Sequence, residues 1–137
     1  MINSSIKIKM TDLKNLKKVK SFNIDEFDGM NVKIGEVILM DVEQKDFGDG
    51  LKEVRQIRIL TENLSKEGQE EIKAGEYVGL KKDLTTGEWG YPDGSNSKAM
   101  KVLNYFKVNS FDELIGKKCM VVKRVNDNKE FLGIHFG

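Results

Sequence analysis

Residues 97–136, which read SKAMKVLNYFKVNSFDELIGKKCMVVKRVNDNKEFLGIHF, contain one helical pattern followed by one hairpin pattern. The helical pattern has apolar side chains at the i, i+3, i+4, i+7 spacing of one helical face, at Ala99, Val102, Leu103 and Phe106. It predicts a helix over residues 98–107, and Ser97 is a suitable N-cap. Ser110 and Glu113 form a capping-box pattern, which predicts a second short turn after the helix. The hairpin pattern predicts two strands, residues 118–125 and 130–136, around the polar loop 126–129.

Three strand patterns precede the helix. The first covers residues 32–44, and its alternation of side chains slips at Gly35, which predicts a β-bulge. The second covers residues 52–61, after a strong turn signal at residues 45–50. The third covers residues 77–84. Three strands, a helix and a closing hairpin are the element order of a mainly β, five-stranded Greek-key barrel of the OB type.

Length and composition indicate one ordinary globular domain. The chain has 137 residues, of which 39% are apolar and 33% are charged. We expect a barrel domain over residues 29–137, and an N-terminal extension over residues 1–28 that packs on or beside it. The start of the chain lacks the apolar core of a signal peptide. Its single cysteine, Cys119, favours a reducing compartment, so we expect the protein to be cytoplasmic.

Charge is unevenly distributed, although the net charge is only +1. Residues 1–20 contain six lysines and one acidic residue, and residues 97–124 contain seven basic and two acidic residues. Residues 21–76 are acidic, with seven basic against fourteen acidic side chains. A basic face forms only if both basic regions lie on one side of the molecule; the alternative is an ordinary solvated surface.

Three short segments add a resemblance to the element order. They are Glu88-Trp89-Gly90-Tyr91-Pro92, Ser97-Lys98 at the helix start, and Leu114-Ile115-Gly116-Lys117-Lys118 at the entry to a strand. From about residue 30 to residue 137 the chain resembles the OB-fold superfamily, and in particular small archaeal and viral proteins that bind single-stranded nucleic acid. This resemblance implies a ligand that crosses the second and third strands, between the first–second and fourth–fifth loops.

The resemblance implies ten candidate binding residues. They are Gln56 and Arg58 on the second strand, Tyr77 and Lys81 on the third, Phe47 in the first–second loop, Trp89 and Tyr91 after the third strand, and Lys123, Arg124 and Lys129 around the fourth–fifth loop. The aromatic residues would stack on bases, and the basic residues would meet phosphates.

Each candidate also has a purely structural interpretation. Trp89 and Tyr91 would then close the bottom of the barrel or pack on the helix. Phe47, between acidic residues, would belong to an ordinary turn, and Tyr77 would be a sheet residue. The lysines of the closing hairpin would form a solvated face.

Catalytic and metal-binding patterns are missing from the sequence. One cysteine and one histidine, Cys119 and His135, cannot form a zinc site alone, and no nucleotide-binding glycine motif occurs. We therefore expect no enzyme activity, no metal and no cofactor.

The first hypothesis is a protein that binds single-stranded nucleic acid, DNA rather than RNA. The alternative is a protein-interaction or assembly module, of viral or other origin, that binds a protein partner or a second copy of itself. No membrane contact is expected.

Overall fold

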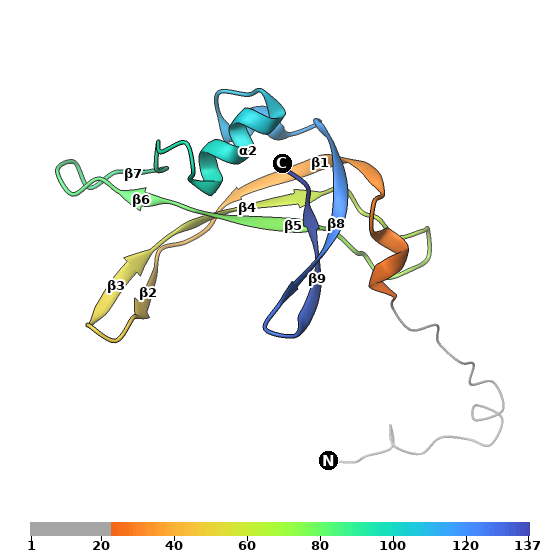
Figure 1. Cartoon of the computed structure of the whole chain (residues 1–137), viewed down its shortest axis with the longest axis horizontal. Coiled ribbons are helices and arrows are strands. Elements are labelled where there is room, and N and C mark those ends of the chain that lie inside the picture. Colours follow the sequence, from red (N-terminus) through yellow and green to blue (C-terminus); the bar gives the residue numbers. More distant parts are fainter. Residues whose placement is uncertain (1–22) are drawn as a thin grey trace, which may run out of the picture.

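The computed structural model describes residues 23–137 (Figure 1). Its largest unit is a five-stranded antiparallel sheet in the order β5-β4-β1-β8-β9. The strands are β1 (Asn31–Leu39), β4 (Gln56–Thr61), β5 (Gly75–Gly79), β8 (Lys118–Asn126) and β9 (Lys129–Ile134). Two short two-stranded ribbons accompany it: β2 (Glu43–Asp46) with β3 (Leu51–Val54), and β6 (Lys81–Lys82) with β7 (Trp89–Gly90). The prediction of a mainly β fold is confirmed.

Each of the three predicted upstream strands is divided into two by a bend. The first becomes β1 and β2, the second becomes β3 and β4, and the third becomes β5 and β6. Two of the bends touch, because Nε of Arg55 donates a hydrogen bond of 2.8 Å to the carbonyl oxygen of Met40. Beyond the bends the ribbons leave the core, and all residues of β2 are exposed. The uninterrupted strands predicted from the sequence were therefore too long.

Gly35 produces the predicted bulge. The register of β1 against β4 shifts between Ile34 and Glu36. A Cβ atom at Gly35 would lie 3.2 Å from the backbone nitrogen of Glu62, so the bulged strand approaches its neighbour closely and a side chain there would need a small shift of Glu62. The bulge keeps Ile34 buried while it reverses the side-chain alternation of the rest of β1.

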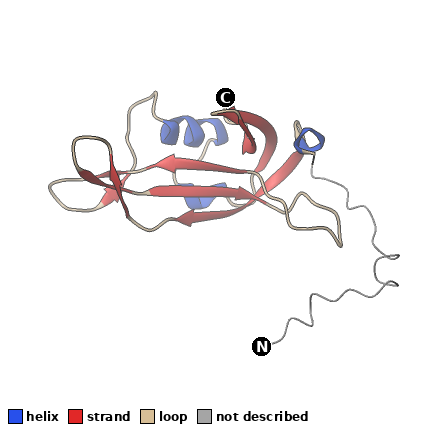
Figure 2. Ribbon diagram, turned by 90° about the horizontal axis from the view of Figure 1, so that it is seen from below, coloured by secondary structure: helices blue, strands red, loops and turns tan. Residues whose placement is uncertain are grey.

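The predicted helix is present as α2 (Lys98–Phe106), and its four expected apolar residues are buried. Ser97 caps it, because its Oγ accepts a hydrogen bond of 3.2 Å from the backbone N–H of Met100. The 3-10 turn η3 (Phe111–Leu114) follows, and the predicted capping box of Ser110 and Glu113 is formed. Figure 2 shows α2 lying along one side of the sheet. The core fills the space between α2, η3 and the inward faces of the strands.

The first described residues form another 3-10 turn, η2 (Ile24–Phe27), which packs against β8 and β9. Nζ of Lys123 on β8 lies 2.7 Å from a carboxylate oxygen of Asp25, and the backbone N–H of Lys123 donates to the carboxylate of Asp28. Figures 1 and 2 both place η2 at the end of the sheet opposite to the β6–β7 ribbon. Of the predicted N-terminal extension, residues 23–28 thus pack beside the sheet, and residues 1–22 lie outside the described residues.

The edge strands β5 and β9 come together without forming a backbone ladder. Their link is Glu76 of β5, whose side chain is only 4% exposed. Its carboxylate accepts hydrogen bonds from Nζ of Lys98, from Nε of Arg124 and from the backbone N–H of Ile134, at 2.8, 2.7 and 2.8 Å. These donors come from α2, β8 and β9. We call Glu76, Lys98 and Arg124 the Glu76 clasp. The closed hydrogen-bonded barrel expected from the sequence is therefore not formed.

Gly133 makes room for the Glu76 clasp. A Cβ atom at this position would fall well inside van der Waals distance of the Glu76 carboxylate and of the Arg124 side chain. With no side chain on Gly133, Arg124 can cross β9 and donate a second hydrogen bond, 2.8 Å long, from Nη2 to the carbonyl oxygen of Ile134. The ring of Phe136 lies beneath both cations, 5.5 Å from Nζ of Lys98 and 5.2 Å from Cζ of Arg124.

We predict that Glu76→Gln lowers the free energy of unfolding by about 2–3 kcal/mol. Removing one partner of a fully buried ion pair costs roughly 3–5 kcal/mol. The cost is lower here because the side chains of Arg124 and Lys98 are 35% and 39% exposed and partly screened by water. Urea unfolding followed by circular dichroism measures the change.

The matched control is Glu53→Gln, which removes the carboxylate that pairs with Lys82 at 2.8 Å between the two ribbons. Both of these side chains are more than one third exposed, so its loss should cost less than about 1 kcal/mol. Equal effects of the two substitutions would show that the Glu76 clasp does not hold the sheet edges together.

Candidate functional site

The outer face of β4 and β5 presents an arginine–tyrosine pair. Arg58 lies directly opposite Tyr77 in the β4–β5 register, and Cζ of Arg58 is 5.6 Å from the centre of the Tyr77 ring. Their neighbours Ile59 and Val78 point into the core, so the pair faces outward. Tyr77 is 46% exposed. The structure thus brings two of the sequence-predicted binding residues into contact on an accessible surface.

The surface beside this pair is open on one side. On β5, Tyr77 stands between Gly75 and Gly79, which have the same side-chain direction. The side chain of Leu60 covers Gly75, where a Cβ atom would lie 2.9 Å from it. A Cβ atom at Gly79 would meet no atom within 4 Å, so the surface beside the ring is open there. Gln56 is exposed and lies opposite Gly79 in the register. We call Gln56, Arg58, Tyr77 and Gly79 the Tyr77 face.

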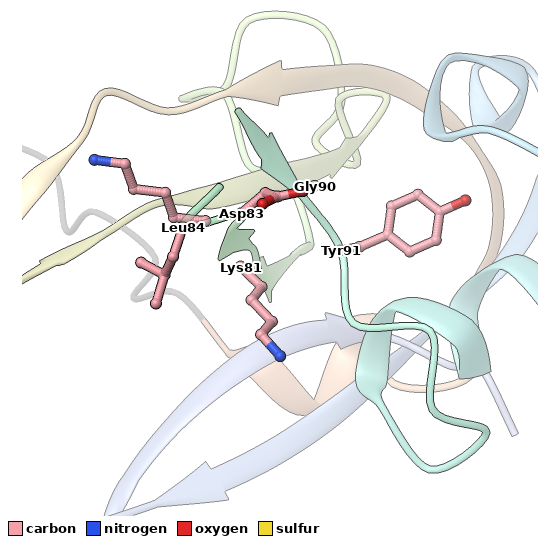
Figure 3. Close-up of a pocket in the computed structure, with 6 residues that line it drawn as sticks. Lys81, Asp83, Leu84, Gly90 and Tyr91 are labelled. Carbon is pink, nitrogen blue, oxygen red and sulfur yellow. The ribbon is translucent and has the colours of Figure 1, made fainter. Parts of the chain in front are cut away.

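Lys81 lies farther along the same polypeptide, in β6, where it is exposed and pairs with Gly90 of β7. It lines a hollow of about 490 Å³ together with Asp83, Leu84 and Tyr91. Figure 3 shows the Lys81 and Tyr91 side chains pointing away from each other. The hollow is therefore not a cage in which a cation and an aromatic ring converge on one ligand.

Trp89 lies in the β6–β7 ribbon, and Tyr91 follows directly after it. Trp89 is half-buried and pairs with Lys82 in β7. The ring of Tyr91 meets the buried ring of Phe111 edge-on, with 5.6 Å between their centres. Tyr91 thus packs on η3 and remains 39% exposed, whereas the structural interpretation placed it at the bottom of the barrel or on the predicted helix.

Phe47 stands in the turn between β2 and β3. Its ring is 59% exposed, and its backbone N–H donates across the turn to the carbonyl oxygen of Gly50, at 3.5 Å. The carboxylate of Asp46 accepts the backbone N–H of Gly48, at 2.8 Å. The turn is satisfied internally, and it displays Phe47 to solvent.

The basic residues of the closing hairpin differ in how far they are engaged. Lys129 is exposed at the start of β9. Lys123 is ion-paired with Asp25 at 2.7 Å and lies 3.9 Å from Glu130. The hydrogen bond that Nζ of Lys123 donates to the carboxylate of Asp25, together with the negative charge of Asp25, raises the pKa of Lys123. Arg124 is engaged most, since its guanidinium belongs to the Glu76 clasp. The guanidinium of Arg124 therefore helps to close the sheet and is not available to bind a phosphate.

Glu76 and Lys98 are the important residues that sequence reasoning missed. Glu76 has the same strand parity as Val78, which identifies it as inward-facing once β5 is known to begin at Gly75. The predicted third strand began one residue too late to include it. Lys98 stands at the start of α2, where a basic residue is normally a solvated side chain.

No metal-binding or catalytic arrangement stands out among residues 23–137. This part of the chain contains no group of three or more His, Cys, Asp or Glu side chains that could hold a metal ion. Backbone N–H groups of Thr85 and Thr86 hold the pKa of Asp83 below its usual range, as expected for a carboxylate that organises a turn. None of the helices in this part is long and apolar enough to cross a membrane.

No protein-family model, curated protein or solved structure matches the chain.

We predict that Cys119 is inert in the folded protein. Burial raises the pKa of its thiol to about 11, with a smaller contribution from the charge of Glu62. Because the ordinary pKa of a cysteine thiol is 9.0, the reactive thiolate is about 100-fold rarer at pH 8 in the folded protein than in the unfolded chain. Iodoacetamide should therefore react about 100-fold more slowly with the folded protein. The raised pKa also means that the thiol stabilises the fold fully below about pH 9 and that this stabilisation is lost as the pH rises through 11. Equal alkylation rates with and without urea would contradict the burial of Cys119.

Proposed function

We propose that the protein binds single-stranded nucleic acid, DNA rather than RNA, across the Tyr77 face and without catalysing a reaction. The observation that carries the proposal is the exposed Tyr77 ring beside Arg58 on the open outer face of β4 and β5. A base stacked on an accessible aromatic ring contributes roughly 1–3 kcal/mol and needs no particular sequence.

The topology supports the same proposal. In the OB arrangement, the outer face of the second and third strands binds an extended polymer between the first–second and fourth–fifth loops. Apart from the two ribbons, β4 and β5 are the second and third strands of the chain, and α2 follows them. The β2–β3 hairpin joins β1 to β4, and a tight turn at Asp127 and Asn128 joins β8 to β9. We therefore propose an OB-type Greek-key fold whose β5–β9 seam is closed by the Glu76 clasp.

The binding mode follows from the surroundings of the ring. Arg58 holds Tyr77 from the side of β4, and Gly79 leaves the neighbouring surface free for a base. Gln56 offers an amide to a base edge or a sugar. Phe47 provides a second exposed ring at the tip of the β2–β3 hairpin. Lys81 and Lys129 supply charge on either side.

We predict that Tyr77→Ala weakens binding to a fluorescently labelled oligo-dT by about 5- to 150-fold, because it removes a stack worth roughly 1–3 kcal/mol. Fluorescence anisotropy at low salt measures the affinity, and a parallel titration with oligo-rU tests the preference for DNA. Tyr105→Ala is the matched control, because Tyr105 is 45% exposed but lies on α2 against Phe106 and His135. Equal affinities of the two variants would remove the Tyr77 face from the proposal.

A protein partner is the second candidate function. Large apolar side chains are exposed on the two ribbons and at their bases, namely Leu39, Val42, Phe47, Leu51 and Leu84. Leu84 is 93% exposed, in a turn that the carboxylate of Asp83 organises. Exposed apolar side chains mark an interaction site where they form one contiguous patch. If the wild-type chain fails to bind oligo-dT or oligo-rU at low salt and forms a concentration-dependent oligomer, this second function replaces the first.

A further inference from the structure

The outer face of β8 and β9 gathers cations. Cys119, Val121 and Ile134 point into the core, so the residues that alternate with them face outward, as do those of β1 opposite them in residues 31–33. The outward basic residues are Lys33, Lys118, Arg124 and Lys129. None of the outward residues of these three segments is acidic, although residues 23–137 contain 21 acidic and only 17 basic side chains.

The same face contains an exposed aromatic ring and apolar side chains. Phe131 lies opposite Arg124 in the β8–β9 register and is 41% exposed. Met120 and Val122 are half-buried and face the same way on β8. The guanidinium of Arg124 is held by Glu76, so it is not counted among the available cations. We call the remaining residues the Phe131 face: Lys33, Lys118, Met120, Val122, Lys129 and Phe131.

Two lysines of the Phe131 face lie directly opposite each other. Lys33 of β1 is the register partner of Lys118 of β8, and both side chains are exposed. Neither forms an ion pair with another residue in the described part of the chain. Like charges in directly opposed positions of a sheet are destabilising. An anion bound between the two ammonium groups would remove this repulsion, so the pair favours a negatively charged ligand.

The cations are spread over the length of the hairpin. Lys118 begins β8 and Asn126 ends it, which at roughly 3.3 Å per residue is a distance of about 26 Å along the strand. Lys129 is the register partner of Asn126. The Lys33–Lys118 pair and Lys129 therefore lie at opposite ends of the Phe131 face, and this spacing suits an extended polyanion better than a single small anion.

The Phe131 face adjoins the Tyr77 face at the seam between β5 and β9 (Figure 1). Glu76 is the chain neighbour of Tyr77, and its carboxylate accepts a hydrogen bond of 2.8 Å from the backbone N–H of Ile134. Phe131 precedes Ile134 by three residues on β9. A strand that leaves Tyr77 thus has one seam to cross before it reaches the Phe131 face.

We infer that the Phe131 face is the phosphate-binding half of the nucleic-acid site, where Lys33, Lys118 and Lys129 contact the backbone of the strand and Phe131 stacks on a second base. This inference rests on the proposed function, and it adds a division of labour to it. The Tyr77 face supplies stacking with one nearby arginine, and the Phe131 face supplies most of the charge. Neither Lys33, Lys118 nor Phe131 was a candidate from the sequence.

The salt dependence of binding tests the role of the lysines. Each phosphate neutralised on a single strand contributes about 0.7 to the slope of log K against log salt concentration. Replacing Lys33, Lys118 and Lys129 together by glutamine in the full-length chain should therefore make the slope for oligo-dT shallower by about 2. The affinity at about 50 mM salt should fall at least tenfold.

A matched control replaces three other exposed lysines that form no ion pair among the described residues: Lys66, Lys101 and Lys107. The net charge changes by the same amount, so the slope should change by less than about 1 if position matters more than net charge. Urea unfolding of the first triple variant should give an unchanged or higher midpoint, because the repulsion between Lys33 and Lys118 is removed. A loss of affinity would then not be a loss of folded protein.

Phe131→Ala tests the second stack. It should weaken oligo-dT binding by about 5- to 150-fold and leave the salt slope unchanged, because it removes a ring and no charge. Fluorescence anisotropy measures both quantities in one series of titrations. An unchanged affinity would remove base stacking from the Phe131 face.

The outcomes separate this inference from the proposed function. If the Lys33, Lys118 and Lys129 replacements leave affinity and slope unchanged, or if both triple variants lose equally, the Phe131 face is overturned while the Tyr77 face stands. If they weaken binding but Tyr77→Ala does not, the Phe131 face stands and the Tyr77 face falls. If the wild type does not bind oligo-dT at low salt, both proposals fail.

Discussion

A buried carboxylate joins the two edges of the main sheet of this protein. The sheet order leaves β5 and β9 as edges, and Glu76 connects them by accepting hydrogen bonds from Lys98, Arg124 and the backbone of Ile134. An ion of this kind is stable away from water only when every strong acceptor position is matched by a donor. Because those donors belong to α2, β8 and β9, the clasp is complete only when all three elements are in place. The geometry of the sheet closure is thus specified by directional contacts in addition to apolar burial.

The Glu76 clasp also shapes the surface of the protein. It uses Lys98 and Arg124, two cations that a count of charges would assign to the solvent-facing surface. The ion pairs of Lys123 and Lys82 reduce the free positive charge further. Residues 23–137 contain 17 basic and 21 acidic side chains, so this part of the chain combines an exposed aromatic face with a net charge of −4.

The aromatic residues are divided between two environments by the alternation of the strands and by the bends. Tyr77 is directed outward because its neighbours Glu76 and Val78 point into the core. Tyr91 lies beyond the β6–β7 ribbon, where the chain turns back toward η3, and its ring packs on Phe111. Residues of similar type, close in sequence, therefore have different roles, and only Tyr77 lies next to a cation on the face of the main sheet.

Local sequence patterns were sufficient to predict the helix and the strands of this chain. The helical stripe, the Ser97 cap, the capping box at Ser110 and the closing hairpin all depend on residues within a few positions of one another, and the structure contains each of them. The slip of alternation at Gly35 likewise predicted a bulge that is present. Six of the ten candidate binding residues are exposed, namely Gln56, Tyr77, Lys81, Phe47, Tyr91 and Lys129.

Contacts between residues far apart in the chain determined how the sheet closes and which partners its charged side chains have. Whether β5 and β9 pair through their backbones or through side chains depends on Glu76 meeting groups that lie 22, 48 and 58 residues away in the chain. The same contacts determined that Arg124 faces a carboxylate instead of solvent. The bends that divide the strands at Arg55 and Leu80 depend on which residues reach the core. Side-chain periodicity reports only the immediate neighbours of a residue, so it predicted the strands and the helix but not the partners that close the sheet.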